Sequence, residues 1–161
     1  LKKNIHEVDG KWDLIMFHHS FEHIPDPVET MKSVSRLLGQ GGVCLIRIPT
    51  VSSYAWEHYR ENWVQLDAPR HFFLHSVRSI ELLAGMTDLT LEKVVYDSTE
   101  FQFWGSEQYK RDIPLYNPEY QSFGPSRSLF SRREIAGFRR KATDLNQKNR
   151  GDACAFYLRK K

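Results

Sequence analysis

Histidine and glutamate side chains that can bind a metal ion or transfer a proton gather near residue 20 of the sequence. His19, Glu22 and His23 fall within five consecutive positions, so two imidazoles and a carboxylate can converge on one divalent ion such as Zn²⁺. His71 could add a fourth ligand. The alternative is that Glu22 and His23 brace a turn by hydrogen bonds. The sequence favours this alternative and predicts no metal site.

This cluster follows a segment with the pattern of a buried strand. Residues 12–18 are a short apolar run, as found in strands that are buried on both faces. A helix is expected downstream, because Asp26 can cap it, Pro27 suits its first position and Glu29 can complete a capping box. Glycines within 39–42 are expected to end that helix. The polar cluster therefore lies at the carboxyl end of a strand, where α/β proteins commonly present their chemistry.

The rest of the sequence alternates predicted strands and helices. The first helix is followed by another strand, and a strand–helix–strand unit makes its two strands parallel. The further predicted elements are strand 43–48, helix 76–84, strand 91–96, a helix from the Ser131–Glu134 capping box to Gly151, and strand 153–158. This order predicts an α/β fold in a single domain over residues 1–161.

Two long segments, residues 50–75 and 98–129, lack a clear hydrophobic period and are rich in aromatic residues. We expect both to be irregular. Long loops inside a compact domain are usually functional or disordered, and their aromatic content argues against disorder. They are candidates for a lid over a substrate.

Composition excludes several classes of protein. Hydrophobic residues make up 40% and charged residues 27% of the chain, which is typical of a globular domain. No apolar run approaches the roughly 20 residues of a membrane span, and no signal peptide is visible. Cys44 and Cys154 lie in apolar runs, which indicates buried thiols in a reducing, cytoplasmic environment.

Positive charge is concentrated toward the end of the chain. Residues 126–161 hold eleven Lys and Arg against three Asp and Glu, whereas residues 1–125 are net negative. A basic segment could meet phosphate or a membrane surface. No RNA-binding motif accompanies it. A solvated helix face is the favoured interpretation, and nucleic acid is not a predicted partner.

Three segments match the pattern of a known family. Residues 12–27 read Trp-Asp-Leu-Ile-Met-Phe-His-His-Ser-Phe-Glu-His-Ile-Pro-Asp-Pro, and residues 37–49 read Leu-Leu-Gly-Gln-Gly-Gly-Val-Cys-Leu-Ile-Arg-Ile-Pro. Together they resemble the fourth strand, the turn after it and the entry to the fifth strand of class I S-adenosylmethionine-dependent methyltransferases. Gln40 stands where the family usually has proline. Residues 66–76, Leu-Asp-Ala-Pro-Arg-His-Phe-Phe-Leu-His-Ser, are similar to a segment of sugar C-methyltransferases.

The resemblance implies a partial Rossmann-like three-layer sandwich, with a mostly parallel sheet and a final antiparallel strand. The strands present would be the family's fourth to seventh, in the order 4-5-7-6. The family's first three strands and its glycine-rich cofactor turn would be absent, so we expect the chain to be a C-terminal portion. Strand 12–18 would then lie at an edge of the sheet, which predicts self-association or a longer protein.

Site residues are also implied by the resemblance. His18, His19 and Ser20 would face the methionine end of the cofactor. His71 would be the catalytic base, because imidazole titrates near neutral pH; the alternative is that His71 anchors its loop. Arg70 replaces a glutamate of the sugar C-methyltransferases. The residues expected to bind substrate are Tyr54, Trp63, Arg70 and Phe72.

Three functions follow from these expectations. The leading one is methyl transfer from S-adenosylmethionine to a small molecule, with cofactor binding dependent on the missing N-terminal half of the intact protein. The second is a non-catalytic binding module derived from a methyltransferase. The third is metal-assisted 2′-O-methylation of RNA, since the pattern at His19, Glu22 and His23 is near that of such enzymes.

Overall fold

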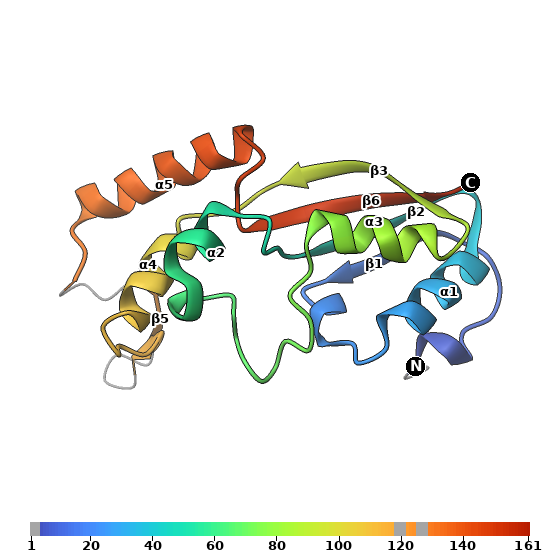
Figure 1. Cartoon of the computed structure of the whole chain (residues 1–161), viewed down its shortest axis with the longest axis horizontal. Helices are drawn as coiled ribbons and strands as arrows, with labels where there is room; N and C mark the ends of the chain where they lie inside the picture. The colour runs from blue at the N-terminus through green and yellow to red at the C-terminus, as the bar shows by residue number, and fades with distance from the viewer. Residues whose placement is uncertain (1–3, 118–121, 125–128) are drawn as a thin grey trace. The chain divides into compact units, whose positions relative to one another are not determined.

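The computed structural model describes residues 4–117, 122–124 and 129–161, which form two compact units (Figure 1). Unit 1 comprises Leu1–Thr50, Pro69–Val95 and Ala153–Lys161, and unit 2 comprises Val51–Ala68 and Tyr96–Asp152. None of the described helices is long and apolar enough to cross a membrane.

Unit 1 is built on a four-stranded sheet in the order β1-β2-β6-β3. The strands are β1 (Trp12–His18), β2 (Leu38–Pro49), β6 (Ala153–Lys160) and β3 (Leu89–Tyr96). β1 pairs with β2 in parallel, and β6 is antiparallel to β2. This is the predicted 4-5-7-6 order, with the last strand of the chain inserted between two earlier ones.

Two helices of unit 1, α1 (Pro27–Leu37) and α3 (Val77–Gly85), contact each other and cover one face of the sheet (Figure 1). Short 3-10 turns, η1 (Ile5–Glu7) and η2 (Phe21–His23), flank β1. Asp26 caps α1 as predicted, since its Oδ1 accepts a hydrogen bond of 3.2 Å from the Glu29 N–H. The Glu29 carboxylate pairs with Lys32 at 2.6 Å.

The two faces of the sheet differ sharply. On the helix-covered face, Ile15 and Phe17 of β1 lie beside Cys44 and Ile46 of β2, and both β2 residues are fully buried. Side chains alternate between faces along a strand. The opposite face of β1 therefore presents Trp12, Leu14 and Met16, which are 50%, 58% and 57% exposed. None of the helices described in unit 1 covers these three side chains.

The glycines at 39–42 were expected to end α1, and this prediction is wrong. The helix ends at Leu37, and β2 starts directly at Leu38 and runs through the glycines. A side chain at Gly42 would come within 2.9 Å of the Trp12 carbonyl oxygen, and Gly41 has a positive φ of 76°. The glycines therefore let β2 approach β1, where the register between the strands shifts.

Unit 2 contains several helices, so the prediction that residues 50–75 and 98–129 are irregular is wrong for residues 54–62 and 101–109. Its elements are α2 (Tyr54–Tyr59), η3 (Arg60–Asn62), α4 (Phe101–Tyr109), β4 (Tyr116–Asn117), β5 (Ser122–Phe123) and α5 (Arg132–Gln147). α4 buries six of its nine residues. A helix that is buried on most sides shows no apolar stripe in its sequence. Residues 118–121 and 125–128 of the second segment lie outside the described residues.

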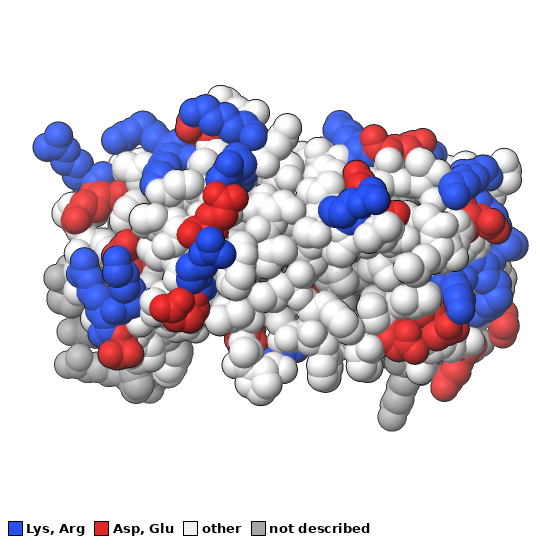
Figure 2. All heavy atoms as spheres, viewed as in Figure 1, with Lys and Arg blue, Asp and Glu red and all other residues white. Residues whose placement is uncertain are grey.

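The C-terminal helix begins as predicted and ends early. Ser131 and Glu134 form the expected capping box, but α5 stops at Gln147, before Gly151. Asn149 then adopts a left-handed conformation with φ of 56°. Basic residues of this region are paired with acidic ones, as in Lys148–Asp144 at 2.8 Å. Figure 2 shows the two signs interspersed on the viewed face, which fits a solvated helix face.

Candidate functional site

The polar cluster after β1 is centred on the carboxylate of Glu22. Glu22 lies in η2 and is 2% exposed. Its Oε1 lies 3.6 Å from His19 Nδ1 and 3.9 Å from His71 Nε2. Neither of its carboxylate oxygens has a hydrogen-bond partner among the described residues. A buried carboxylate that lacks hydrogen bonds costs stability, so this residue marks the site.

A backbone hydrogen bond holds His71 at this carboxylate. The N–H of Phe72 donates to the Glu22 carbonyl oxygen at 2.9 Å, which ties the segment after residue 69 to η2. His23 Nδ1 lies 2.8 Å from the carbonyl oxygen of Arg70. The rings of His23 and His71 meet edge to face with centroids 4.8 Å apart. Residues separated by almost fifty positions are thus gathered at one point.

Arg47 connects the two histidines that end β1. It donates hydrogen bonds to the Nε2 atoms of His18 and His19. Because Nε2 of His19 accepts, the proton of a neutral ring is on Nδ1, which faces Glu22. His19 also has a positive φ of 48°, an uncommon backbone conformation that is often found at functional sites.

The surroundings shift the pKa values of two buried groups, Glu22 and His75. Burial alone would raise the pKa of Glu22, but contacts with His19, its own backbone N–H and the charge of His71 hold that pKa below its usual value. Burial lowers the pKa of His75 to about 4, and the charge of Glu22 opposes this shift. His75 packs on Phe21 at 5.2 Å between ring centroids. It is therefore neutral near pH 7.

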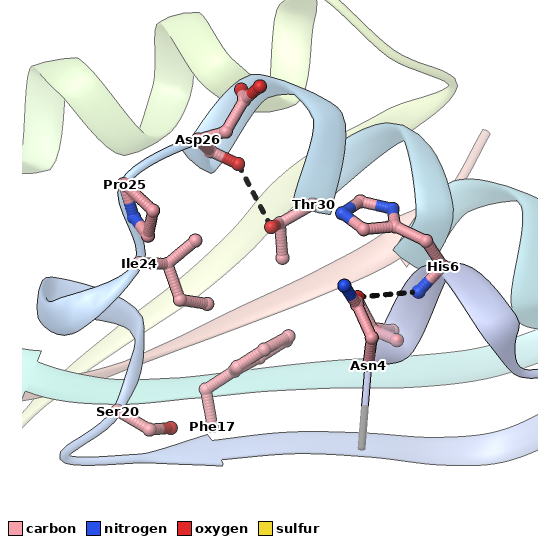
Figure 3. Close-up of a pocket in the computed structure, with 9 residues that line it drawn as sticks. Asn4, His6, Phe17, Ser20, Ile24, Pro25, Asp26 and Thr30 are labelled. Carbon is pink, nitrogen blue, oxygen red and sulfur yellow. Dashed lines mark hydrogen bonds between the residues drawn. The ribbon is translucent and has the colours of Figure 1, made fainter. Parts of the chain in front are cut away.

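A pocket of about 390 Å³ opens next to the cluster (Figure 3). It lies between the end of β1, the start of α1 and the residues before β1. Its polar lining includes Asn4, His6, Ser20 and Asp26, and Phe17 supplies an apolar wall. The volume is at the small end of the range for ligand pockets, about 300–1,000 Å³.

Of the expected site residues, the structure gathers those of unit 1. His71, Arg70 and Phe72 lie beside η2, and Ser20 lines the pocket. Phe72 is 61% exposed. His18 and His19 share Arg47 as a partner.

Tyr54 and Trp63, the other two residues expected to bind substrate, belong to unit 2. Trp63 is fully buried and donates from Nε1 to Asp152 Oδ2 at 3.0 Å. The Tyr54 hydroxyl accepts from Lys141 Nζ at 3.0 Å. Both side chains thus have structural partners in their own unit, and their substrate roles stay predictions.

Two residues of the site were missed from the sequence. Arg47 is a charge inside the apolar run of β2, and that mismatch was a usable signal. His75 follows His71 by four positions in a segment without periodicity, and no pattern set it apart.

A buried carboxylate beside imidazoles can act chemically in two ways. It can hold an imidazole in position for proton transfer, or it can join imidazoles around a divalent metal ion. Glu22, His23 and His71 each bring one ligand atom within 4.8 Å of the others.

The chain matches one protein family, and its fold is similar to that of several solved structures. Residues 1–94 match the family described as "Methyltransferase domain". No curated protein sequence matches the chain. The fold is similar to a SAM-dependent methyltransferase from Thermotoga maritima, at 16% identity and a TM-score of 0.57, over 100% of this chain and 63% of the other.

Two further solved structures share the fold. A SAM-dependent methyltransferase from Archaeoglobus fulgidus has 13% identity and a TM-score of 0.50, over 98% of this chain and 63% of the other. Mycolic acid cyclopropane synthase, complexed with SAH and CTAB, has 17% identity and a TM-score of 0.53, over 97% and 58%. The chain thus spans about three fifths of the length of these structures.

Proposed function

We propose that this chain, which belongs to the methyltransferase domain family, supplies the acceptor side of an S-adenosylmethionine-dependent methyl transfer to a small molecule. S-adenosylmethionine is the cofactor of that family. The observation that carries the proposal is the placement of a buried carboxylate, Glu22, 3.9 Å from the His71 imidazole at the carboxyl end of a parallel strand.

In the proposed reaction His71 takes the proton from the acceptor. A methyl donor reacts with an electron pair, so an acceptor hydroxyl, amine or carbon acid must lose its proton during transfer. Imidazole suits this role near neutral pH. Glu22 would hold the ring in position for this transfer. Arg70 and Phe72, on either side of His71, would contact the acceptor.

The residues present fit only one part of the cofactor. Asn4, Ser20 and Asp26 offer polar groups in the pocket of Figure 3, which suit the amino and carboxylate groups of a methionine moiety. His18 and His19 would add contacts at the strand end. When bound, S-adenosylmethionine supplies an electrophilic methyl group. We infer that the adenosine half of the cofactor needs further polypeptide, because the chain spans only about three fifths of the length of the methyltransferase structures it resembles.

The uncovered face of β1 supports this requirement. Trp12, Leu14 and Met16 present a row of exposed apolar side chains on the edge strand of the sheet. Such an edge pairs readily with another chain segment. We infer that an N-terminal half covers it in the intact protein, and that this chain alone self-associates through residues 12–18. Sedimentation of the chain should give a dimer that Leu14→Lys dissociates. A parent chain that stays monomeric at high concentration would contradict the inference.

Two experiments test the function. Calorimetric titration of this chain with S-adenosylhomocysteine should show no micromolar binding, and micromolar binding would end the requirement for further polypeptide. The protein as its gene encodes it should move a radioactive methyl group from S-adenosylmethionine into the small-molecule fraction of a cell extract.

The alternatives give other results. A non-catalytic module would transfer no radioactive methyl group to any fraction of the extract. Label in RNA alone would favour the metal-assisted RNA reaction.

A further inference from the structure

We propose that Glu22, His23 and His71 form a binding site for one divalent transition-metal ion of the Zn²⁺ type. This site differs from the set considered from the sequence, because it includes His71, there only a possible fourth ligand, and leaves out His19. One carboxylate and two imidazoles are a donor set that suits Zn²⁺ and its neighbours in the first transition row.

The separations fit one ion. Zn²⁺ binds imidazole nitrogen and carboxylate oxygen at about 2.0–2.2 Å, which places tetrahedral ligand atoms about 3.4 Å apart. His71 Nε2 and Glu22 Oε1 lie 3.9 Å apart, and all three ligand atoms lie within 4.8 Å of one another. Small side-chain rotations would close the site around an ion.

The Glu22 carboxylate gives independent support. It is 2% exposed, and neither oxygen has a hydrogen bond among the residues that the structure describes. A buried carboxylate normally has hydrogen-bond donors or a paired cation. The imidazoles of His19 and His71 lie 3.6 and 3.9 Å from Oε1, which is too far for a hydrogen bond. A metal ion held by Glu22, His23 and His71 would satisfy the carboxylate.

Outer contacts orient the ligands as they do in metal sites. His23 is within 2.8 Å of the Arg70 carbonyl oxygen through Nδ1, which can only donate to that oxygen. Its Nε2 lone pair is thereby available for a metal. A ligating histidine almost always donates its other ring N–H in this way. His19, fixed by Arg47, directs Nδ1–H toward Glu22 and so supports the carboxylate from outside.

Metal binding and proton transfer compete for the same imidazole. With a metal ion on Nε2, the neutral ring of His71 carries its proton on Nδ1, so neither nitrogen can accept a proton and an occupied site would block His71 as the base. This inference uses residues of the proposed function but does not rest on methyl transfer. Its test therefore needs neither cofactor nor acceptor, and the two can fail separately.

The test is calorimetric titration of the whole chain with Zn²⁺ alone, repeated with Co²⁺ while the visible absorption is recorded. We expect one equivalent of Zn²⁺ and a Co²⁺ spectrum of low coordination number. Glu22→Gln and His23→Ala should each weaken binding at least about tenfold, because loss of an outer contact alone costs 10–100-fold in metal affinity. His58→Ala, an exposed histidine of unit 2, is the matched control and should bind as the parent does.

Circular dichroism checks that the variants fold. Glu22 is buried, so His23→Ala, at a partly exposed position, keeps the test decisive if Glu22→Gln unfolds. Parent binding that equals that of His23→Ala would overturn the proposal. Equal weakening by His58→Ala would do the same, since it would indicate scattered surface histidines.

Discussion

Two carboxylates, Glu22 in unit 1 and Asp152 in unit 2, are equally buried at 2% exposure but have opposite surroundings. Asp152 accepts a hydrogen bond of 3.0 Å from the Trp63 indole. Burial raises its pKa to about 6. Glu22 has imidazoles around it, no hydrogen bond to its oxygens among the described residues, and a lowered pKa.

We infer from this difference that Asp152 has a structural role and Glu22 a functional one. Asp152 has a hydrogen-bond partner in the core, and burial makes its charged form unfavourable. The oxygens of Glu22 have no hydrogen bond among the described residues, yet His19 and His71 lie beside them. Proteins retain such under-satisfied polar groups mainly where chemistry needs them. The comparison predicts that changes at Asp152 and its partner affect stability, and that changes at Glu22 affect function.

The largest stability effect is expected at the partner of Asp152. Trp63→Ala should lower the free energy of unfolding by about 3–5 kcal/mol, because it opens a cavity in the core and removes the Asp152 hydrogen bond. Urea denaturation measures this loss. Trp12→Ala, at a half-exposed indole, is the control and should cost less than about 1 kcal/mol. Equal losses at the two positions would show that Trp63 stabilises the fold no more than the half-exposed Trp12 does.

The effect of Asp152→Asn on the free energy of unfolding should depend on pH. The folded-state pKa of about 6 exceeds the ordinary 3.8, so the folded state binds the proton more tightly and the parent loses stability as pH rises from about 4 to 6. The amide mimics the protonated acid. The variant should therefore be more stable than the parent at pH 8, by up to about 3 kcal/mol, and no more stable at pH 4. Thermal unfolding at both pH values checks this, and a parallel pH dependence of parent and variant would refute it.

His75 should give the opposite pH dependence in unit 1. Its folded-state pKa of about 4 is below the ordinary 6.5, so stability is complete above pH 6.5 and is lost as pH falls toward 4. At pH 5 the loss is about 2 kcal/mol. His75→Phe should remove it while keeping the ring packing on Phe21. If denaturation of this variant between pH 7 and 5 matches the parent, the histidine is not held neutral.

The smallest effect on stability is expected at Glu22. Glu22→Gln should change the free energy of unfolding by less than about 1 kcal/mol at pH 8, because its oxygens have no hydrogen bond to lose. Urea denaturation beside Asp152→Asn gives the comparison directly. A loss above 2 kcal/mol would place Glu22 with Asp152 as a structural group.

Much of the fold could be predicted from the sequence. The strand at residues 12–18, the cap at Asp26, the Ser131–Glu134 box and the strand order are confirmed, because local chemistry fixes each of them or the family pattern implies it. The prediction that strand 12–18 is buried on both faces is wrong, since none of its residues is fully buried. The assignment to methyltransferases is also confirmed. The start of β2 at Leu38 was not predicted. Glycines often end helices, whereas here they allow β2 to lie close to β1.

The site could be predicted only in part. The histidines near residue 20 were evident, but their assembly with His71 depends on backbone hydrogen bonds from Phe72 and Phe73 to Glu22 and on the contact of His23 with the Arg70 carbonyl. No local pattern encodes a contact over almost fifty positions. Helix α4 escaped prediction for a related reason, because its surroundings bury it on most sides and leave no hydrophobic period.

The most direct test of the account is the rate of labelled methyl transfer by the gene-encoded protein and its His71→Ala variant, with His58→Ala as control. A general base contributes about 10²–10⁴-fold to a rate. We predict that His71→Ala lowers kcat at least about 100-fold while its thermal unfolding matches the parent. Transfer by His71→Ala at the rate of His58→Ala would contradict the account.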